Sequence, residues 1–398
     1  MAVLTDPSVG AGIHRPPALV EPGPALSPKR LARFSRQLLM PGFGELAQRR
    51  LAAARVLVVG AGGLGSASIP YLAAAGIGTI GVIDSDVVEL SNLHRQVSHS
   101  LGDVGRDKVD SIADTVAAID PEVQLIRHNL RVDSTTILGI LAGYDLVLDG
   151  SDNFPTRYLT NDAAALQHKP LVWGAILQYA GQASVAWIDH GPTYRDLFPV
   201  PPAPGEVMSC SIGGVLPSVC AVIGAIMSGE AIKLITGIGN PLLGRVTTYD
   251  ALSGRFREIE YGSIPDAEPV TELTDYELFC GITREPTIDA GSFPEAIDVA
   301  ELSRRLAAGS PMQLVDVREP FETHIARIDP SELIPLGSLE QCLSRIRTDV
   351  PVVVYCHHGV RSNRAAAILR RHGLRNVQNL DGGIDAFAAH EDPTMARY

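Results

Sequence analysis

The segment from Gly60 to Gly65, GAGGLG, constrains the fold of this 398-residue chain more than any other feature. It follows the apolar run 55–59 and precedes 66–75, which has the pattern of a helix, and a second apolar run covers 79–83. A strand, a glycine turn, a helix and a strand in this order predict a buried parallel sheet with right-handed crossovers. Further strands are predicted near 123–128, 145–149, 171–176 and 183–188, and two short helices, broken at Pro41-Gly42, within 29–54.

The length predicts two domains, because one domain commonly holds roughly 100–200 residues. The expected fold class is α/β: a Rossmann-like domain followed by a second, smaller α/β domain with strands at 313–319 and 351–356 and helices at 364–373 and 382–390. The expected boundaries are a disordered proline-rich tail over 1–28, the first domain over 29–262, a linker over 263–292 and the second domain over 293–398.

The composition excludes several classes of function. A net charge of −12 argues against nucleic-acid binding, which needs a basic surface. No apolar run approaches the ~20 residues that span a bilayer, and the first 30 residues lack a signal pattern, so we expect a cytoplasmic protein without a membrane segment. Five cysteines, an odd number without paired spacing, predict free thiols rather than a disulfide framework.

The glycine turn predicts a phosphate-binding site. Glycines let the backbone approach a phosphate, and the N-terminus of the following helix presents free N–H groups to it. Asp84, at the end of the next strand, is expected to accept a hydrogen bond from a ribose hydroxyl. A nicotinamide-dependent dehydrogenase would show the same pattern. The glycines expected to contact the nucleotide are Gly60, Gly62, Gly63 and Gly65.

Polar and basic residues beyond this turn favour a nucleoside triphosphate. Asn92, Arg95 and Gln96 follow Asp84, and Lys108 comes thirteen residues after Arg95. A positive cluster suits a triphosphate with a leaving pyrophosphate better than a dinucleotide. The alternative is that Arg95 and Lys108 are solvated surface charges.

The segment LVLDGSDNFPTR, residues 146–157, places Asp149, Asp152 and Asn153 at the end of a predicted strand. The carboxyl ends of parallel strands border the crevice in which ligands of open α/β sheets bind. We expect Asp152 to hold Mg²⁺ on phosphate oxygens, with Asn153 beside it at the nucleotide. Asp149 has a structural alternative, because an Asp that closes a strand often caps the following turn.

A second chemical centre is predicted at Cys356, in the segment YCHHGVRSN. Backbone N–H groups and a helix N-terminus favour a thiolate, and Arg361 is expected to add a fixed positive charge. An inert buried cysteine would need neither Gly359 nor Arg361, and a phosphatase loop needs five residues between cysteine and arginine, where this chain has four. The tighter loop favours a carrier of one terminal sulfur. His357 and His358 are expected to be exposed loop residues, because no third metal ligand lies nearby in sequence.

The motifs RFSRQ, GAGGLG, IDSDVVELSNLHRQ, GRDKV and DGSDN resemble the ubiquitin-activating-enzyme superfamily, in its MoeB/ThiF branch, over about residues 29–280. Residues 293–398 resemble a single rhodanese domain through VDVRE, CHHGVRS and GGIDAF. The pairing is similar to fused adenylyltransferase/sulfurtransferase proteins of the MoeZ type.

The resemblance implies ATP-dependent adenylylation of the C-terminal glycine of a separate, small ubiquitin-like sulfur-carrier protein, followed by sulfur transfer to give a thiocarboxylate. The sulfur donor would be a cysteine desulfurase or thiosulfate, and the end product could be molybdopterin, thiamine, cysteine or a secondary metabolite. Arg36 would reach into a partner subunit's nucleotide site in a homodimer, and Cys210, in MSCSIGGVLP, matches the family's acyl-transfer cysteine. Gly63 and Asp84 would hold adenosine and ribose, Asn92, Arg95 and Lys108 the phosphates, and Asp152 the metal.

The chain also departs from its relatives. Many of them hold a structural zinc with two C-x-x-C pairs, but here the corresponding stretches read TYRD (193–196) and ELFC (277–280), so we expect no zinc there. Cys220 and Cys342 are expected to be inert. Two other functions stay open at this point: a nicotinamide-dependent oxidoreductase with a regulatory thiol domain, and a non-catalytic scaffold that binds carrier proteins.

Overall fold

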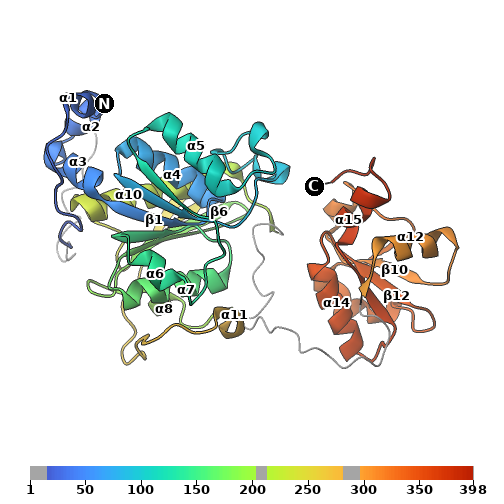
Figure 1. Cartoon of the computed structure of the whole chain (residues 1–398). Helices are drawn as coiled ribbons and strands as arrows, with labels where there is room; N and C mark the ends of the chain where they lie inside the picture. Colours follow the sequence, from blue (N-terminus) through green and yellow to red (C-terminus); the bar gives the residue numbers. More distant parts are fainter. Residues whose placement is uncertain (1–15, 203–212, 281–295, 398) are drawn as a thin grey trace. The chain divides into compact units, whose positions relative to one another are not determined.

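The computed structural model describes residues 16–202, 213–280 and 296–397. The chain forms two compact units, Met1–Arg284 and Glu285–Tyr398. Both are α/β in architecture, as the sequence predicts (Figure 1).

The first unit is built on an eight-stranded sheet in the order β3-β2-β1-β4-β5-β6-β7-β8. The strands are β1 (Arg55–Val59), β2 (Thr79–Ile83), β3 (Gln124–His128), β4 (Leu146–Asp149), β5 (Leu171–Leu177), β6 (Ala180–Ala186), β7 (Arg245–Asp250) and β8 (Arg255–Glu260). Strands β1 to β5 are parallel, which confirms the parallel sheet. Strands β6 to β8 extend it as antiparallel neighbours; β6 overlaps the strand predicted near 183–188, whereas its antiparallel direction and the strands β7 and β8 were not predicted.

Helices cover both faces of this sheet. They are α1 (Pro28–Arg33), α2 (Ser35–Leu38), α3 (Gly44–Ala53), α4 (Gly63–Ala75), α5 (Lys108–Ile119), α6 (Ile137–Leu141), α7 (Phe154–Leu166), α8 (Tyr194–Leu197), α10 (Pro217–Thr236) and α11 (Tyr276–Phe279), with the 3-10 turns η1 (Leu90–Asn92) and η2 (Leu101–Asp103). Figure 1 shows α4, α5 and α10 on one face and α6, α7 and α8 on the other. Two apolar clusters fill the two sides, so the central strands are buried on both faces.

Helix α10 corrects one expectation. It is 20 residues long and has a mean hydropathy of 1.7, which is long and apolar enough to cross a membrane, although the sequence was expected to contain no such run. In the structure, however, 61% of its apolar window is buried, and Val219, Ile223 and Met227 belong to the core cluster beside α4. The apolar composition is explained by burial inside the first unit.

The chain segments flanking the first domain also differ from the expectation. Within the expected tail, the N–H of Leu19 donates to the carbonyl of Leu234 (3.0 Å) and that of Gly23 to the carbonyl of Arg49 (3.2 Å). Proline-rich backbone forms few hydrogen bonds of its own, so neighbouring carbonyls hold residues 16–28 in place. Within the expected linker, residues 276–279 form α11, whose Tyr276 is buried against the first unit.

The second unit contains a five-stranded parallel sheet in the order β11-β10-β12-β13-β9. Its strands are β9 (Ala296–Ile297), β10 (Gln313–Asp316), β11 (Glu332–Leu333), β12 (Val352–Tyr355) and β13 (Val377–Leu380). Its helices are α12 (Val299–Ala307), α13 (Pro320–Thr323), η3 (Leu336–Arg345), α14 (Val360–Arg371) and α15 (Gly383–His390). Apolar clusters lie on both sides of this sheet too, and the predicted strands and helices of this domain are confirmed.

Candidate functional site

The glycine turn joins β1 to α4 at the carboxyl end of the parallel strands. Gly60 has φ +91°, which favours glycine, and a side chain on Gly65 would overlap the carbonyl oxygen of Gly60. The turn is therefore tight, and it leads directly into the N-terminus of α4, whose backbone N–H groups a phosphate can use.

Asp84 is anchored to the same turn. Its carboxylate accepts from the N–H of Ala61 (2.7 Å) and from that of Asp86 (2.8 Å). Burial raises the pKa of Asp84, and the positive charge of Lys108 opposes that rise. Each oxygen keeps acceptor capacity beyond its backbone bond, so a ribose hydroxyl could still donate to it.

Lys108 begins α5 and is buried, with its Nζ 2.8 Å from Oδ2 of Asp86. The side chain of Asp86 is 67% exposed, so this ion pair is open to solvent on the Asp86 side. Sequence reasoning missed Asp86. The D-S-D pattern of residues 84–86 was the available signal, since it places a second carboxylate two residues after Asp84.

The segment after Asp84 brings further polar groups to the turn. Gln96 is buried, and a side chain at Gly62 would come within 3.7 Å of its Nε2. Its Oε1 is buried and has no hydrogen-bond partner among the residues that the structure describes. Asn92 is also buried, and its Oδ1 accepts from the N–H of Glu89 (3.2 Å).

Arg95 is partly exposed and donates to the carbonyl of Ser91 (3.0 Å), with its Nη1 also 2.8 Å from the ring of His94. Within the described ranges no carboxylate forms an ion pair with it, so its charge is not neutralised there. An arginine that is predicted to bind a phosphate needs such an unneutralised positive charge.

The loop after β4 packs against the glycine turn. A side chain on Gly60 would lie 3.2 Å from the carbonyl oxygen of Gly150, and the N–H of Gly150 donates to Val59 (2.9 Å). Asp152 is therefore beside the turn, and its side chain is exposed. Asn153 caps α7, because its Oδ1 accepts from the N–H of Thr156 (2.9 Å), so the amide already has a structural role.

Asp149 stabilises the turn after β4, which is the structural alternative that the sequence left open. It is fully buried, its Oδ1 accepts from the N–H of Ser151 (2.9 Å), and Nε of Arg157 lies 3.9 Å from its Oδ2. Burial raises its pKa, and the nearby Arg157 charge acts in the opposite direction. The side chain thus fixes the turn that leads to Asp152.

Within one chain, the fold does not place Arg36 near the glycine turn. It lies exposed on α2, and the preceding Phe34 packs against Gly76, at the C-terminal end of α4. The 13 residues of α4 separate that end from the glycine turn by about 20 Å. Arg36 can therefore serve a nucleotide site only if another subunit presents it.

The two stretches at which relatives are expected to hold zinc are joined by side chains here. Arg195, on α8, forms a bidentate pair with buried Asp162 (2.7 Å for each contact), which also accepts from the hydroxyl of Tyr276 (2.6 Å). The Arg195 guanidinium lies 4.7 Å from the ring centre of Phe279. Hydrogen bonds and a cation–π contact therefore connect α7, α8 and α11, and the expectation of no zinc there stays a prediction.

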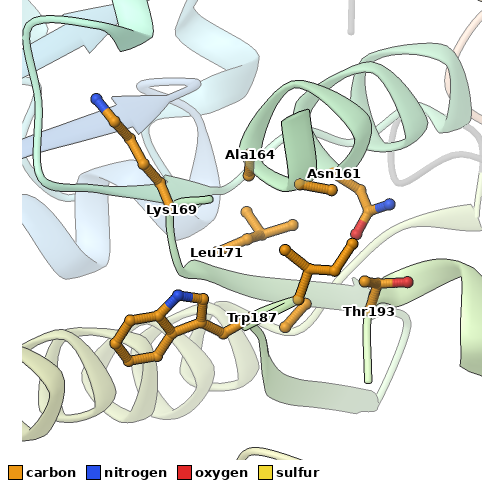
Figure 2. A pocket seen from close by; sticks show the side chains of 9 residues that line it. Asn161, Ala164, Lys169, Leu171, Trp187 and Thr193 are labelled. Carbon is orange, nitrogen blue, oxygen red and sulfur yellow. The ribbon is translucent and has the colours of Figure 1, made fainter. Parts of the chain in front are cut away.

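A small depression, too small to hold a water molecule, lies elsewhere in the first unit, between α7 and the strands β5 and β6 (Figure 2). Its lining includes Leu171, which pairs with Ala186 and is the first residue of β5, and Trp187, which follows β6. Leu171 lies at the amino ends of the parallel strands, whereas the glycine turn lies at their carboxyl ends. This depression is therefore separate from the candidate nucleotide crevice.

In the second unit, Cys356 follows β12 and is buried. Its Sγ lies 3.2 Å from the N–H of Gly359 and 3.3 Å from the hydroxyl of Ser362, and both groups donate to it. Gly359, with φ +98°, caps α14, so the loop also directs the N-terminus of that helix toward the cysteine. These donors stabilise negative charge on sulfur.

Arg361 has a partner that the sequence did not reveal. It forms two contacts with the buried carboxylate of Glu322, at 2.6 and 2.7 Å. The expected fixed positive charge is therefore offset by Glu322, and the donors seen at the sulfur are the N–H of Gly359 and the hydroxyl of Ser362. Residues 315–322, VDVREPFE, place Glu322 shortly after β10, but nothing in that pattern points to Arg361.

His357 and His358 differ from the expected pair of exposed residues. His358 is exposed, but His357 is half-buried, and burial, aided by the charge of His358, lowers the pKa of His357 to about 4. Cys220 is buried and Cys342 partly buried, as expected of structural thiols. Cys210 lies outside the described residues.

Two family models match the chain: the ThiF family over residues 34–268 and the rhodanese-like domain over residues 298–390. "Probable adenylyltransferase/sulfurtransferase MoeZ" of Mycobacterium tuberculosis (strain H37Rv) is 47% identical over 388 residues, covering 96% of this chain and 99% of that protein. "Adenylyltransferase and sulfurtransferase MOCS3" of Mus musculus is 38% identical over 430 residues, covering 100% of this chain and 94% of the relative.

Solved structures support the fold alone. The chain is similar to Escherichia coli MccB crystallised with ATP, with a TM-score of 0.53 and 22% identity over 60% of this chain and 74% of that one. The chain belongs to the ThiF family, carries a rhodanese-like domain after the ThiF domain, and is an enzyme of the adenylyltransferase and sulfurtransferase class.

Proposed function

We propose that this enzyme adenylylates the C-terminal glycine of a small ubiquitin-like sulfur-carrier protein and then converts it to a thiocarboxylate. The observation that carries the proposal is that one chain holds both a charged phosphate crevice and a cysteine whose sulfur accepts two hydrogen bonds. No observation favours a nicotinamide-dependent oxidoreductase or a non-catalytic scaffold.

In the first step, a carboxylate oxygen of the carrier attacks the α-phosphorus of ATP, and pyrophosphate leaves. Glycine-turn N–H groups bind phosphate oxygens, Asp84 orients the ribose, and Arg95 and Lys108 offset the charge that develops on the phosphates. Mg²⁺ would supply further charge neutralisation when bound. Asp152 suits it, because Mg²⁺ is commonly held by one or two carboxylates together with substrate phosphates, and the Asp152 side chain is exposed.

In the second step, the terminal sulfur of a persulfide on Cys356 attacks the acyl carbon, and AMP leaves. Gly359 and Ser362 would hold the Cys356 sulfur through hydrogen bonds. A second thiol must then attack the acyl disulfide, releasing the thiocarboxylate and leaving a protein disulfide for an external thiol to reduce. We assign that role, or an earlier thioester role, to Cys210.

The setting that fits this chemistry is a homodimer in the cytoplasm, with a cysteine desulfurase or thiosulfate as the sulfur donor. Cys280, Cys342 and Cys356 are free thiols, as expected in a reducing compartment. The position of Arg36 far from its own crevice supports the dimer. Molybdopterin synthesis is one of the pathways that a thiocarboxylated carrier could feed.

The experiment supplies ATP, Mg²⁺, thiosulfate and a purified small protein ending in Gly-Gly, and follows that protein by mass spectrometry. Wild type should exchange one oxygen for sulfur, and Cys356→Ala should lose this product while retaining pyrophosphate release. Cys342→Ala is the matched control and should behave as wild type. Full sulfur transfer by Cys356→Ala would refute the role of this loop, and no pyrophosphate release with any such carrier would refute the adenylylation step.

A further inference from the structure

Three side chains that could bind a metal ion meet beside the cysteine loop of the second unit. They are His357, His358 and Asp385, and one ligand atom from each lies within 4.8 Å of the others. The two histidines are adjacent in sequence, whereas Asp385 comes from α15, 27 residues further on. This third group is the ligand that sequence spacing could not supply.

The backbone holds this cluster in place. The N–H of Asp385 donates to the carbonyl of His357 (3.1 Å), and that of Ile384 donates to the carbonyl of Cys356 (2.9 Å). Gly383, with φ +62°, lets the two segments come this close, because a side chain there would overlap both carbonyl oxygens. Asp385 therefore has a fixed position relative to the histidines, which favours binding because little order is lost.

The two imidazole rings are stacked, with centres 3.8 Å apart and planes inclined by 30°. Nδ1 of His358 lies 3.9 Å from Oδ2 of Asp385. Ligand atoms around a tetrahedral zinc are about 3.3 Å apart, given metal–ligand distances near 2.0–2.1 Å. His358 has a 62% exposed side chain, so its ring can rotate to close the remaining gap.

We propose that His357, His358 and Asp385 form a binding site for a borderline divalent transition-metal cation of the Zn²⁺ type. Two imidazole nitrogens and one carboxylate oxygen match the ligand preference of Zn²⁺, whereas Mg²⁺ and Ca²⁺ prefer oxygen alone. Three protein ligands leave a fourth position for water or another ligand. The site is distinct from the zinc position of the relatives in the first unit and does not depend on the proposed carrier reaction.

Arg397 competes with the cation for Asp385. Its Nε and Nη2 each lie 2.8 Å from a carboxylate oxygen, and its side chain is 57% exposed. Exposed ion pairs are weak, so a divalent cation can displace the guanidinium. Removal of Arg397 should then strengthen metal binding.

The test measures Zn²⁺ affinity of the full-length chain by competition with a chromophoric chelator. His358→Ala and Asp385→Asn should each weaken binding at least about tenfold relative to wild type. The control is His372→Ala, a partly exposed histidine of the same unit that lies 3.8 Å from Glu340 and outside the cluster. Zinc bound at any position outside this cluster is common to all these proteins and does not explain a difference between them.

Arg397→Gln should raise the Zn²⁺ affinity, whereas the ligand variants lower it, because this substitution frees the carboxylate of Asp385. Circular dichroism checks that each variant keeps its fold, which is expected of His358→Ala because the side chain is exposed. Affinities of His358→Ala and Asp385→Asn equal to that of the control would overturn the site. An unchanged affinity in Arg397→Gln would overturn the assignment of Asp385 as a ligand.

Discussion

Cys356 and Cys280 are both buried, but their surroundings give the two thiols different chemistry. The sulfur of Cys356 accepts hydrogen bonds from Gly359 and Ser362 at the start of a helix. Cys280 instead packs in an apolar cluster, where burial raises its pKa to about 11. A thiol with so high a pKa is almost entirely protonated near neutral pH and is a poor nucleophile.

Cys280 should therefore resist alkylation in the native protein. Iodoacetamide at about pH 8 should leave it unmodified in the folded chain and modify it fully in urea, because only unfolding exposes the thiol and returns its pKa to the ordinary range. Peptide mass spectrometry of both samples measures the difference. Labelling of native Cys280 at the rate of the unfolded chain would contradict the burial and pKa found here.

Asp152 is the residue on which the proposed Mg²⁺ site of the first unit depends. Asp152→Ala should reduce carrier-dependent exchange of labelled pyrophosphate into ATP by roughly 10²-fold or more, because the phosphates lose their metal ligand. The matched control is Asp114→Ala, which removes a similarly exposed carboxylate from α5 and should leave exchange intact. Equal exchange in the two variants would mean that Asp152 only belongs to the turn.

At the scale of elements, the second unit joins the short helix α13 to the start of α14 through one ion pair. Glu322 and Arg361 are both mostly buried, with side-chain exposures of 5% and 15%. A buried charge left without its partner is costly, whereas removal of both charges is much less so. The pair therefore fixes where α13 lies relative to the cysteine loop.

A double-mutant cycle tests this connection. Glu322→Ala and Arg361→Ala should each destabilise the second unit by about 3 kcal/mol, and the double variant should lose clearly less than the sum, because each single change leaves one charge unpaired. Urea unfolding of the full chain measures the free energies. Strictly additive losses would show that the two side chains are not coupled.

At the scale of the whole molecule, Arg36 and the nucleotide crevice occupy opposite ends of α4. If a second subunit supplies Arg36, each active site combines residues of two chains. Arg36→Ala and Asp152→Ala would then damage the same reaction from different subunits.

Mixing these two inactive variants should restore about a quarter of the wild-type activity, since half of the randomly formed dimers would carry one intact site of two. Pyrophosphate exchange after subunit exchange measures the recovery. Asp152→Ala mixed with itself is the control and should recover nothing. Full activity of Arg36→Ala alone, or no recovery on mixing, would rule out a site shared between subunits.

The sequence alone determined those features that depend on local backbone requirements. The glycine turn, the strand before it and the helix after it follow from a pattern in which glycine permits conformations that other residues avoid. The loop from Cys356 to α14 follows for the same reason, since Gly359 marks the turn. Both candidate sites and the parallel part of the first sheet were therefore predictable.

Only the tertiary structure decided which charged groups meet. Asp86 pairs with Lys108, Glu322 with Arg361, and Asp385 approaches His357, although 22, 39 and 28 residues separate the partners. The return of α11 to the first unit and the pairing of β6 with β7 are equally non-local. These contacts depend on how buried faces pack rather than on residues close in the chain, so local sequence patterns do not predict them.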